Sequence, residues 1–197
     1  FDIFIHIWVI YSSCIKVILR HQGVFLSAHD FEGRTPLHEA ACKDQIECVR
    51  VLLEQKGIDI NTCDNKYIFF LFDFYRTPLH DALRYSSTEL IKLLLNEPQI
   101  DCNAFDQEGK TPLILAVELK NHAIAKILVS KPELDVNMKS FVLFVYLFIL
   151  KFYFMFFSNG IAALHVAIFH SDLKIVKELR KRNDINYAIR TNVLLLL

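Results

Sequence analysis

Three histidines, His38, His80 and His165, recur at equivalent places along the sequence. Imidazole rings bind metal ions and transfer protons near neutral pH, so a shared site would indicate a metal centre or an acid–base catalyst. Each histidine, however, lies in its own copy of a repeated segment, about one repeat from the next and too far for shared ligation. We therefore expect His38 and His80 each to hydrogen-bond the threonine of its own segment.

The cysteines give no better case for a chemical site. They are five in number, with no Cys-x-x-Cys pair and no histidine at ligand spacing: Cys14, Cys42, Cys48, Cys63 and Cys102. This pattern predicts neither a disulfide framework nor a zinc site, but reduced thiols that behave as small hydrophobic side chains in the cytoplasm. The sequence also has no Gly-rich phosphate loop and no nucleophile motif. We expect no catalytic residue, no cofactor and no metal, and so a protein that is not an enzyme.

Composition and charge restrict the class of partner. The chain has 197 residues and 53% hydrophobic content, enough apolar surface for a core. Lys and Arg total 22 and Asp and Glu total 22. With no net charge to attract phosphate groups over a distance, a nucleic-acid partner is not predicted.

The histidines belong to a repeated motif of the form Arg-Thr-Pro-Leu-His-x-Ala. It occurs at 34–41 and 76–82, in a third copy at 110–116 and in a degenerate fourth copy at 161–167. An apolar run of helical periodicity follows each copy, at 46–53, 90–95, 124–129 and 173–179. Each copy then closes on an asparagine: Asn61, Asn103, Asn137 and Asn186.

Local chemistry explains why each copy should form two helices. Thr35 can cap a first helix through its hydroxyl, while Pro36 takes the first helical position, where its missing N–H costs nothing. Small residues such as Ala40 allow two helices to approach closely, and Leu94 and its neighbours supply an apolar face for stacking. Residues 30–33 and 106–109 are turn formers that place a hairpin-like turn, here called a finger, between consecutive copies.

The motif resembles the ankyrin repeat, over residues 14–66, 76–139 and 159–190. The resemblance implies an all-α fold, an α-solenoid of helix-turn-helix units with hairpin-like fingers. It indicates an ankyrin repeat domain over 14–190 with about four and a half repeats, at 14–29 (partial), 30–63, 64–105, 106–139 and 159–190 (degenerate). It also implies a concave surface that binds another protein, in a monomeric array.

The candidate protein-binding residues are those that vary between repeats on that surface. They are Phe31, Glu32 and Arg34 on one finger, Phe105, Gln107 and Lys110 on another, and Glu39, Lys43, Asp81, Arg84 and Tyr85 on the first helices. An exposed aromatic side chain beside an arginine is the composition that binding hot spots favour. The function expected is therefore that of a scaffold or adaptor in the cytoplasm.

The sequence also predicts the state of three other features of the repeats: the turn between the helices, an acidic pair and the closing asparagines. The position between the two helices is usually glycine in ankyrin-like repeats but here reads Asp44, Ser86, Lys120 and Ser171, and a left-handed turn at such residues costs on the order of 1 kcal/mol. The pair Glu39 and Asp81 is interpreted as part of a solvated face. The closing asparagines are expected to bond local main-chain groups, and the resemblance implies hydroxylation there as a secondary possibility.

Two apolar insertions interrupt the repeats, near 67–74 and at 140–158. Segment 141–157 could be a transmembrane helix, although a span would separate repeats that need to stack. It could be a functional loop, although no polar face accompanies its apolar one. The hypothesis we favour is translated non-coding sequence, because both insertions start and stop where the repeat breaks off and resumes.

The chain ends raise the remaining alternatives. Residues 1–13 and 191–197 are similarly apolar, and a chain that begins at Phe1 and ends in four leucines is expected to be a fragment. Two other functions therefore stay open. One is the cytosolic repeat array of a membrane protein such as a channel or receptor, with 141–157 as its span and membrane association as its localisation. The other is the regulatory arm of an enzyme whose catalytic domain lies outside this sequence.

Overall fold

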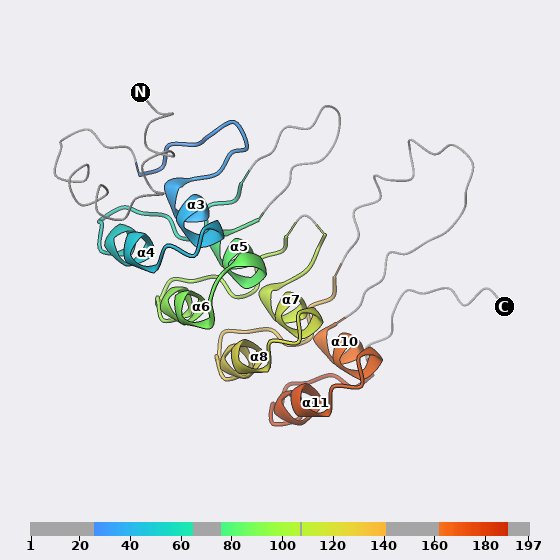
Figure 1. Cartoon of the computed structure of the whole chain (residues 1–197). Coiled ribbons are helices and arrows are strands. Elements are labelled where there is room, and N and C mark those ends of the chain that lie inside the picture. Colours follow the sequence, from blue (N-terminus) through green and yellow to red (C-terminus); the bar gives the residue numbers. More distant parts are fainter. Residues whose placement is uncertain (1–25, 65–75, 107, 141–161, 189–197) are drawn as a thin grey trace, which may run out of the picture. The chain divides into compact units, whose positions relative to one another are not determined.

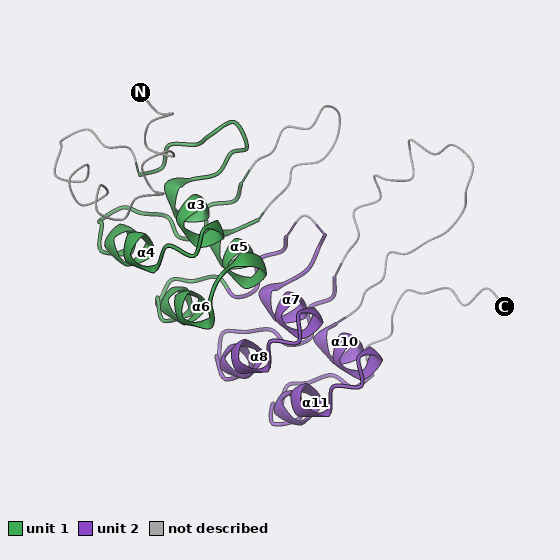
Figure 2. Ribbon diagram, in the orientation of Figure 1, with its two compact units in different colours: residues 1–101 green, residues 102–197 purple. Residues whose placement is uncertain are grey.

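The computed structural model describes residues 26–64, 76–106, 108–140 and 162–188 (Figure 1). These residues form eight helices and no sheet, so the predicted all-α class is confirmed. The chain divides into two compact units, residues 1–101 and residues 102–197 (Figure 2). Unit 1 contains α3 (Pro36–Cys42), α4 (Ile46–Leu53), α5 (Pro78–Tyr85) and α6 (Thr88–Leu95). Unit 2 contains α7 (Pro112–Glu118), α8 (His122–Val129), α10 (Ala163–Phe169) and α11 (Leu173–Leu179).

The first helix of the first three pairs begins where the Thr-Pro motif predicts. Thr35, Thr77 and Thr111 have extended backbones at the N-cap, and a proline follows each of them inside the helix. The hydroxyl of Thr111 accepts a hydrogen bond from the Ile114 N–H at 3.3 Å, which confirms the expected cap. The second helices coincide with the predicted apolar runs, and α4 and α11 match them residue for residue.

The turn between the paired helices confirms the left-handed prediction at three of four positions. Asp44, Lys120 and Ser171 have φ between 53° and 55°. Ser86, at φ −109°, is extended, so the prediction is wrong there. The reason is a different set of bonds: the Ser86 hydroxyl donates to the Ala41 carbonyl, and the Asp44 carboxylate accepts from the N–H of Ser87 at 2.9 Å.

Packing within each unit joins the two helices of a pair and then one pair to the next. In unit 1, α3 packs against α4 and α5, and α6 packs against α4 and α5. In unit 2, α7 packs against α8 and α10, and α11 against α8 and α10. Small and large apolar side chains share the core: Ala40, Ala82 and Ala116 of the first helices and Leu94 and Leu128 of the second helices are all fully buried.

The fingers are tight turns closed at their base by a backbone bond. Asp30 N–H donates to the Arg34 carbonyl at 3.0 Å, and Gly33, at φ 71°, returns a bond to Asp30. The same base recurs in the second repeat, where Asp64 N–H donates to the Arg76 carbonyl at 2.9 Å. The insertion near 67–74 lies outside the described residues, but the two residues that flank it close the finger as in an uninterrupted repeat.

Several predicted segments lie wholly or mainly outside the described residues: 1–13, the partial repeat 14–29, the insertion 140–158 and the tail 191–197. Lys139 and Ala162, on either side of the longer insertion, form an antiparallel bridge. None of the helices in the described part of the chain has the length and apolar character needed to span a membrane.

Candidate functional site

In each of the first three repeats, the residue that ends the finger is a cation that ties the finger to the first helix of the repeat; we call Arg34, Arg76 and Lys110 the finger cations. In the first repeat, the Arg34 guanidinium contacts Glu39 at 3.1 Å and Asp30 at 3.3 Å. Asp30 begins the finger and Glu39 lies on α3, so one side chain holds both ends of the turn against the helix. Glu32, within the same finger, adds a further contact at 3.3 Å.

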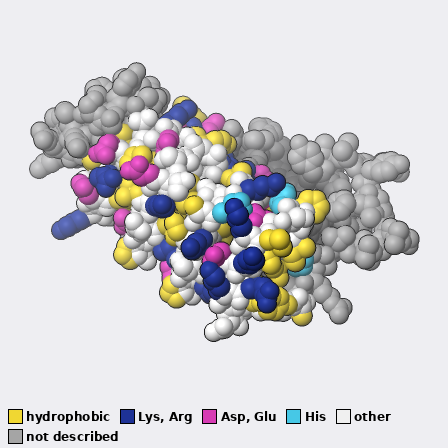
Figure 3. Space-filling view, turned by 60° about the horizontal axis from the view of Figure 1, so that its bottom comes forward, with side chains coloured by type: hydrophobic (Ala, Val, Ile, Leu, Met, Phe, Trp, Pro, Cys, Tyr) yellow, Lys and Arg dark blue, Asp and Glu magenta, His cyan; other side chains and the backbone are white. Residues whose placement is uncertain are grey.

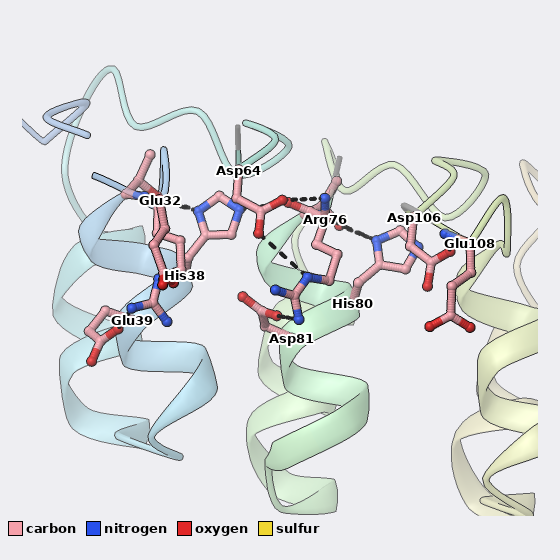
Figure 4. Close-up of polar contacts among 12 residues, drawn as sticks. Glu32, His38, Glu39, Asp64, Arg76, His80, Asp81, Asp106 and Glu108 are labelled. Carbon is pink, nitrogen blue, oxygen red and sulfur yellow. Dashed lines mark hydrogen bonds and ion pairs between the residues drawn. The ribbon is translucent and has the colours of Figure 1, made fainter. Parts of the chain in front are cut away.

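The second repeat reproduces this arrangement despite its insertion (Figure 4). The Arg76 guanidinium lies 3.4 Å from Asp64 and 3.3 Å from Asp81, which is on α5. The Asp64 carboxylate also accepts the backbone N–H of Arg76 at 2.5 Å. An arginine between two carboxylates is therefore the device that positions each finger of unit 1.

The interpretation of Glu39 and Asp81 as a solvated face is wrong. Their relative exposures are 8% and 2%. The finger folds back over the start of the helix, so this position faces the finger cation and not solvent. Burial raises the pKa of Asp81 to about 6, although Arg76 opposes the shift.

The recurrent histidines play the structural part that was predicted. The hydroxyls of Thr35 and Thr77 lie 2.9 Å from Nδ1 of His38 and His80, which confirms the expected bond within each repeat. The Thr35 N–H also donates to Nδ1 of His38, so Nε2 of that ring carries the proton and donates to the Arg76 carbonyl at 2.8 Å. Burial lowers the pKa of His38 to about 4, which keeps the ring neutral.

Sequence reasoning did not find the bond from His38 to Arg76, which joins one repeat to the next. It holds the base of the second finger to the start of α3. The sequence shows only that the histidine recurs, and this recurrence does not identify a bonding partner in another repeat. A single repeat read alone contains no partner for the second ring nitrogen.

The closing asparagines also bridge repeats, so the expectation of bonds to local main-chain groups is wrong for three of them. The Asn61 side chain donates to the Gln99 carbonyl at 2.8 Å and accepts from the Asp101 N–H at 2.8 Å. The same pair of bonds joins Asn103 to Glu133 and Asp135, and Asn137 to Asp184 and Asn186. Asn186 accepts from the N–H of Ala188, two residues on, as the local reading expected.

The finger cation of the third repeat uses different partners. Lys110 lies 2.6 Å from Glu108 in its own finger and 2.8 Å from Glu118 near the end of α7. The position of Glu39 and Asp81 is occupied by Leu115 in this repeat, so the ion pair forms with Glu118, the last residue of α7. Three residues thus form the same kind of link from finger to first helix in unit 2.

The predicted surface residues divide by exposure. Phe31 is 90% exposed at the finger tip and Tyr85 is 56% exposed at the end of α5, while Lys43 is also exposed. Five others are half-buried: Glu32, Arg34, Arg84, Phe105 and Lys110. Glu39 and Asp81 are buried, and Gln107 lies outside the described residues. The structure brings Glu32, Arg34 and Glu39 into one cluster at the base of the first finger.

The cysteines within the described residues are all free thiols. Cys48 and Cys102 are buried, and Cys42 and Cys63 are half-buried. Burial raises the pKa of Cys42, Cys48 and Cys63 above that of an ordinary thiol, which favours the unreactive protonated form. In the part of the chain that the structure describes, no group of three or more His, Cys, Asp or Glu side chains is placed to hold a metal ion.

Comparison with protein families gives matches along most of the chain. A family model described as ankyrin repeats (3 copies) matches residues 3–64 and 63–140, and an ankyrin repeat model matches residues 159–192. The first match begins well before residue 14, where the sequence pattern placed the start of the repeats. The interval between the matches corresponds to the longer insertion. A search of curated proteins found no match. The matched residues, together with the four helical pairs and their fingers, show that the chain belongs to the ankyrin-repeat family.

Proposed function

We propose that this chain is a non-catalytic scaffold or adaptor of the cytoplasm that binds another protein through its fingers and first helices. Ankyrin repeats are in general protein–protein interaction modules. The contact residues we propose are the exposed and half-buried members of the predicted set. Phe31, Arg34 and Tyr85 are the ones we expect to contribute most of the binding energy in unit 1.

The observation that carries this proposal is the state of Phe31. A phenylalanine that is 90% exposed contributes nothing to the core, yet its finger is fixed by bonds on both sides. The Asp30 carboxylate accepts from the N–H groups of Glu32 and Arg34, both at 2.8 Å. A large apolar side chain on a rigid turn loses little conformational entropy when it binds, which favours high affinity.

Glu39 and Asp81 support the proposed surface from below and are not contact residues themselves. Because they are buried, they would not touch a partner directly. They hold Arg34 and Arg76 in one orientation, so that the polar edge of the binding surface is set before the partner arrives.

Affinity capture with quantitative mass spectrometry tests the proposal. We compare the proteins retained by the wild-type chain with those retained by the double variant Phe31→Ala and Tyr85→Ala. The expected result is loss of a specific subset of proteins from the double variant. Because both side chains are exposed, the circular dichroism spectrum and the urea midpoint should stay close to those of the wild type.

The matched control is Tyr187→Ala, which removes an exposed aromatic ring (62% exposed) that is not part of the proposed surface. This variant should retain the same proteins as the wild type. If the double variant and the control retain identical sets, the fingers and first helices are not the binding surface.

A further inference from the structure

The outer face of the second helices differs in charge between the two units, although the helices themselves are equivalent. One exposed position is basic in every repeat: Arg50 in α4, Lys92 in α6, Lys126 in α8 and Lys177 in α11. In unit 1 a glutamate precedes this cation by three residues, Glu47 in α4 and Glu89 in α6. Arg50 and Glu47 lie 3.7 Å apart as an ion pair.

Unit 2 has lost these acids. The equivalent positions are Ala123 in α8 and Lys174 in α11, so the neutralising carboxylate is replaced by a neutral or a basic side chain. The position after the helix changes in the same sense, from Glu54 in the first repeat to Lys181 in the fourth. Substitution at several equivalent positions in one direction produces a net positive surface that the helical fold itself does not require.

We define the basic face as the exposed cations of α8, of α11 and of the two residues that follow α11: Lys126, Lys174, Lys177, Arg180 and Lys181. Glu178 of α11 lies beside these cations and forms an ion pair with Lys181 at 2.7 Å. Because α8 and α11 pack against each other, their exposed cations lie on neighbouring helices. Lys181, and to a lesser degree Lys126, lowers the pKa of Glu178. On the face in view, Figure 3 shows several Lys and Arg side chains close together, with hydrophobic side chains next to some of them.

Arg182, in contrast, is bonded within the fold. Its guanidinium donates to the carbonyls of Lys131 and Leu134 at 2.6 and 2.9 Å and pairs with Asp184 at 2.7 Å. It therefore caps the end of the third repeat and does not belong to the basic face. Within the described residues, no carboxylate forms an ion pair with Lys174, Lys177 or Arg180.

An apolar side chain stands in this charged surface. Leu173, the first residue of α11, is 70% exposed and precedes Lys177 by four residues, so the two lie on one strip of the helix. Exposed leucine beside lysine is the pattern of surfaces that rest on the headgroup region of a bilayer, where the apolar group enters the acyl boundary and the cations meet anionic headgroups. A phosphodiester backbone offers no such apolar environment. Four of the five cations are lysines, whose flexible point charges suit a diffuse anionic surface better than one fixed carboxylate.

We propose that the basic face docks onto the surface of an anionic lipid bilayer, with Leu173 entering the headgroup layer. This contact is peripheral and independent of the segment 141–157. It also leaves the proposed binding surface on the fingers and first helices for a protein. The chain would then bring its protein partner to a membrane surface.

Sedimentation of the full chain with vesicles tests this proposal. We expect binding to vesicles of phosphatidylcholine mixed with phosphatidylserine, little binding to phosphatidylcholine alone, and weaker binding as salt rises. The triple variant Lys174→Gln, Lys177→Gln and Arg180→Gln should bind the mixed vesicles on the order of 100-fold more weakly, since each cation contributes about fivefold. Leu173→Ser should weaken binding by about tenfold or less.

The matched control changes three exposed cations of unit 1, as Arg50→Gln, Lys56→Gln and Lys92→Gln, and should bind as the wild type does. Equal loss in both triple variants, or no loss in the first, overturns the proposal. Binding to neutral vesicles as strong as to anionic ones also overturns it, because insertion of an apolar segment then explains the result. So does binding that requires the basic face but is seen only with a poly-glutamate peptide or a DNA duplex and not with vesicles.

Discussion

At the scale of single residues, each finger of unit 1 depends on an arginine that lies between two carboxylates. This arrangement buries the carboxylate of Asp81, which is 2% exposed, and burial raises its pKa from 3.8 to about 6. An acid with a raised pKa in the folded state stabilises the fold fully below its unfolded pKa and loses that contribution as pH rises through the folded value. His38 acts in the opposite sense, because its pKa falls from 6.5 to about 4, so its contribution is lost as pH falls.

These two groups predict a pH dependence that single variants separate. Between about pH 4 and pH 6 the two effects oppose each other in the wild type. In Asp81→Asn only the histidine effect remains, so stability should fall as pH drops from about 7 to 4. Relative to the wild type, the variant should lose on the order of 2 kcal/mol as pH drops from about 7 to 4, because the wild type gains the Asp81 contribution over that range. Urea unfolding of the wild type and the variant across this pH range measures this difference in stability.

In His38→Gln only the Asp81 effect remains, so stability should rise as pH drops from about 7 to 4. If the stability of both variants changes with pH as that of the wild type does, burial does not perturb these groups.

The left-handed turns give a second prediction at this scale. Lys120 is exposed and has φ 55°, so Lys120→Gly should stabilise the chain by about 1 kcal/mol by removing the strain of a side chain in that conformation. Ser86→Gly is the matched control at the equivalent position. Its backbone is extended and its hydroxyl bonds Ala41, so it should be destabilising. A gain in both variants would mean that all four turns share one conformation.

At the scale of the elements, the asparagines join each repeat to the next. The Asn103 side chain bonds two main-chain groups of the following repeat, both at 2.9 Å, whereas the Asn186 side chain bonds only its own turn among the described residues. We therefore expect Asn103→Ala to lower the free energy of unfolding by about 1 to 3 kcal/mol. Asn186→Ala, at the same place in the motif, should cost about 0.5 kcal/mol or less. Equal costs would mean that the links between repeats contribute nothing to stability.

The sequence predicted the helices well because local chemistry determines them. Thr35 and Pro36 start a helix without help from the rest of the chain, and the apolar runs of α4 and α11 match their helices. The errors occur where the answer depends on a neighbouring element. Asp81 looked like a surface residue because its partner, Arg76, approaches only when the finger folds back. Asn61 looked local because its partners lie in the following repeat, 38 and 40 residues away.

At the scale of the whole molecule, the shorter insertion interrupts a finger without disturbing its base. Asp64 and Arg76 bond as Asp30 and Arg34 do, although eleven residues separate them and not three. Removing residues 67–74 and replacing Tyr75 with glycine leaves Asn65, Lys66 and that glycine between them, which is the length of an uninterrupted finger. Because loop closure costs less for a shorter loop, this deletion should preserve the helical content and keep or raise the urea midpoint. Loss of folding would show that the insertion packs as part of the repeat.

The proposed surfaces could be predicted from the sequence only in part. Phe31 and Tyr85 could be predicted because they lie at positions that vary between repeats, and their exposure agrees with a contact role. The basic face was not identified, because the chain as a whole has no net charge and its cations become a patch only when the outer helices are aligned. Which residues share a face is a property of the stacked repeats and not of any one of them.

Amide hydrogen exchange resolved by NMR would show whether the chain is built of stacked helical pairs. This architecture predicts four separate blocks of slow exchange, at α3–α4, α5–α6, α7–α8 and α10–α11. It also predicts slow exchange at the amides of Asp101 and Asp135, which lie on exposed residues but donate to the asparagine of the preceding repeat. Protection confined to one block, with fast exchange at both of these amides, would contradict it.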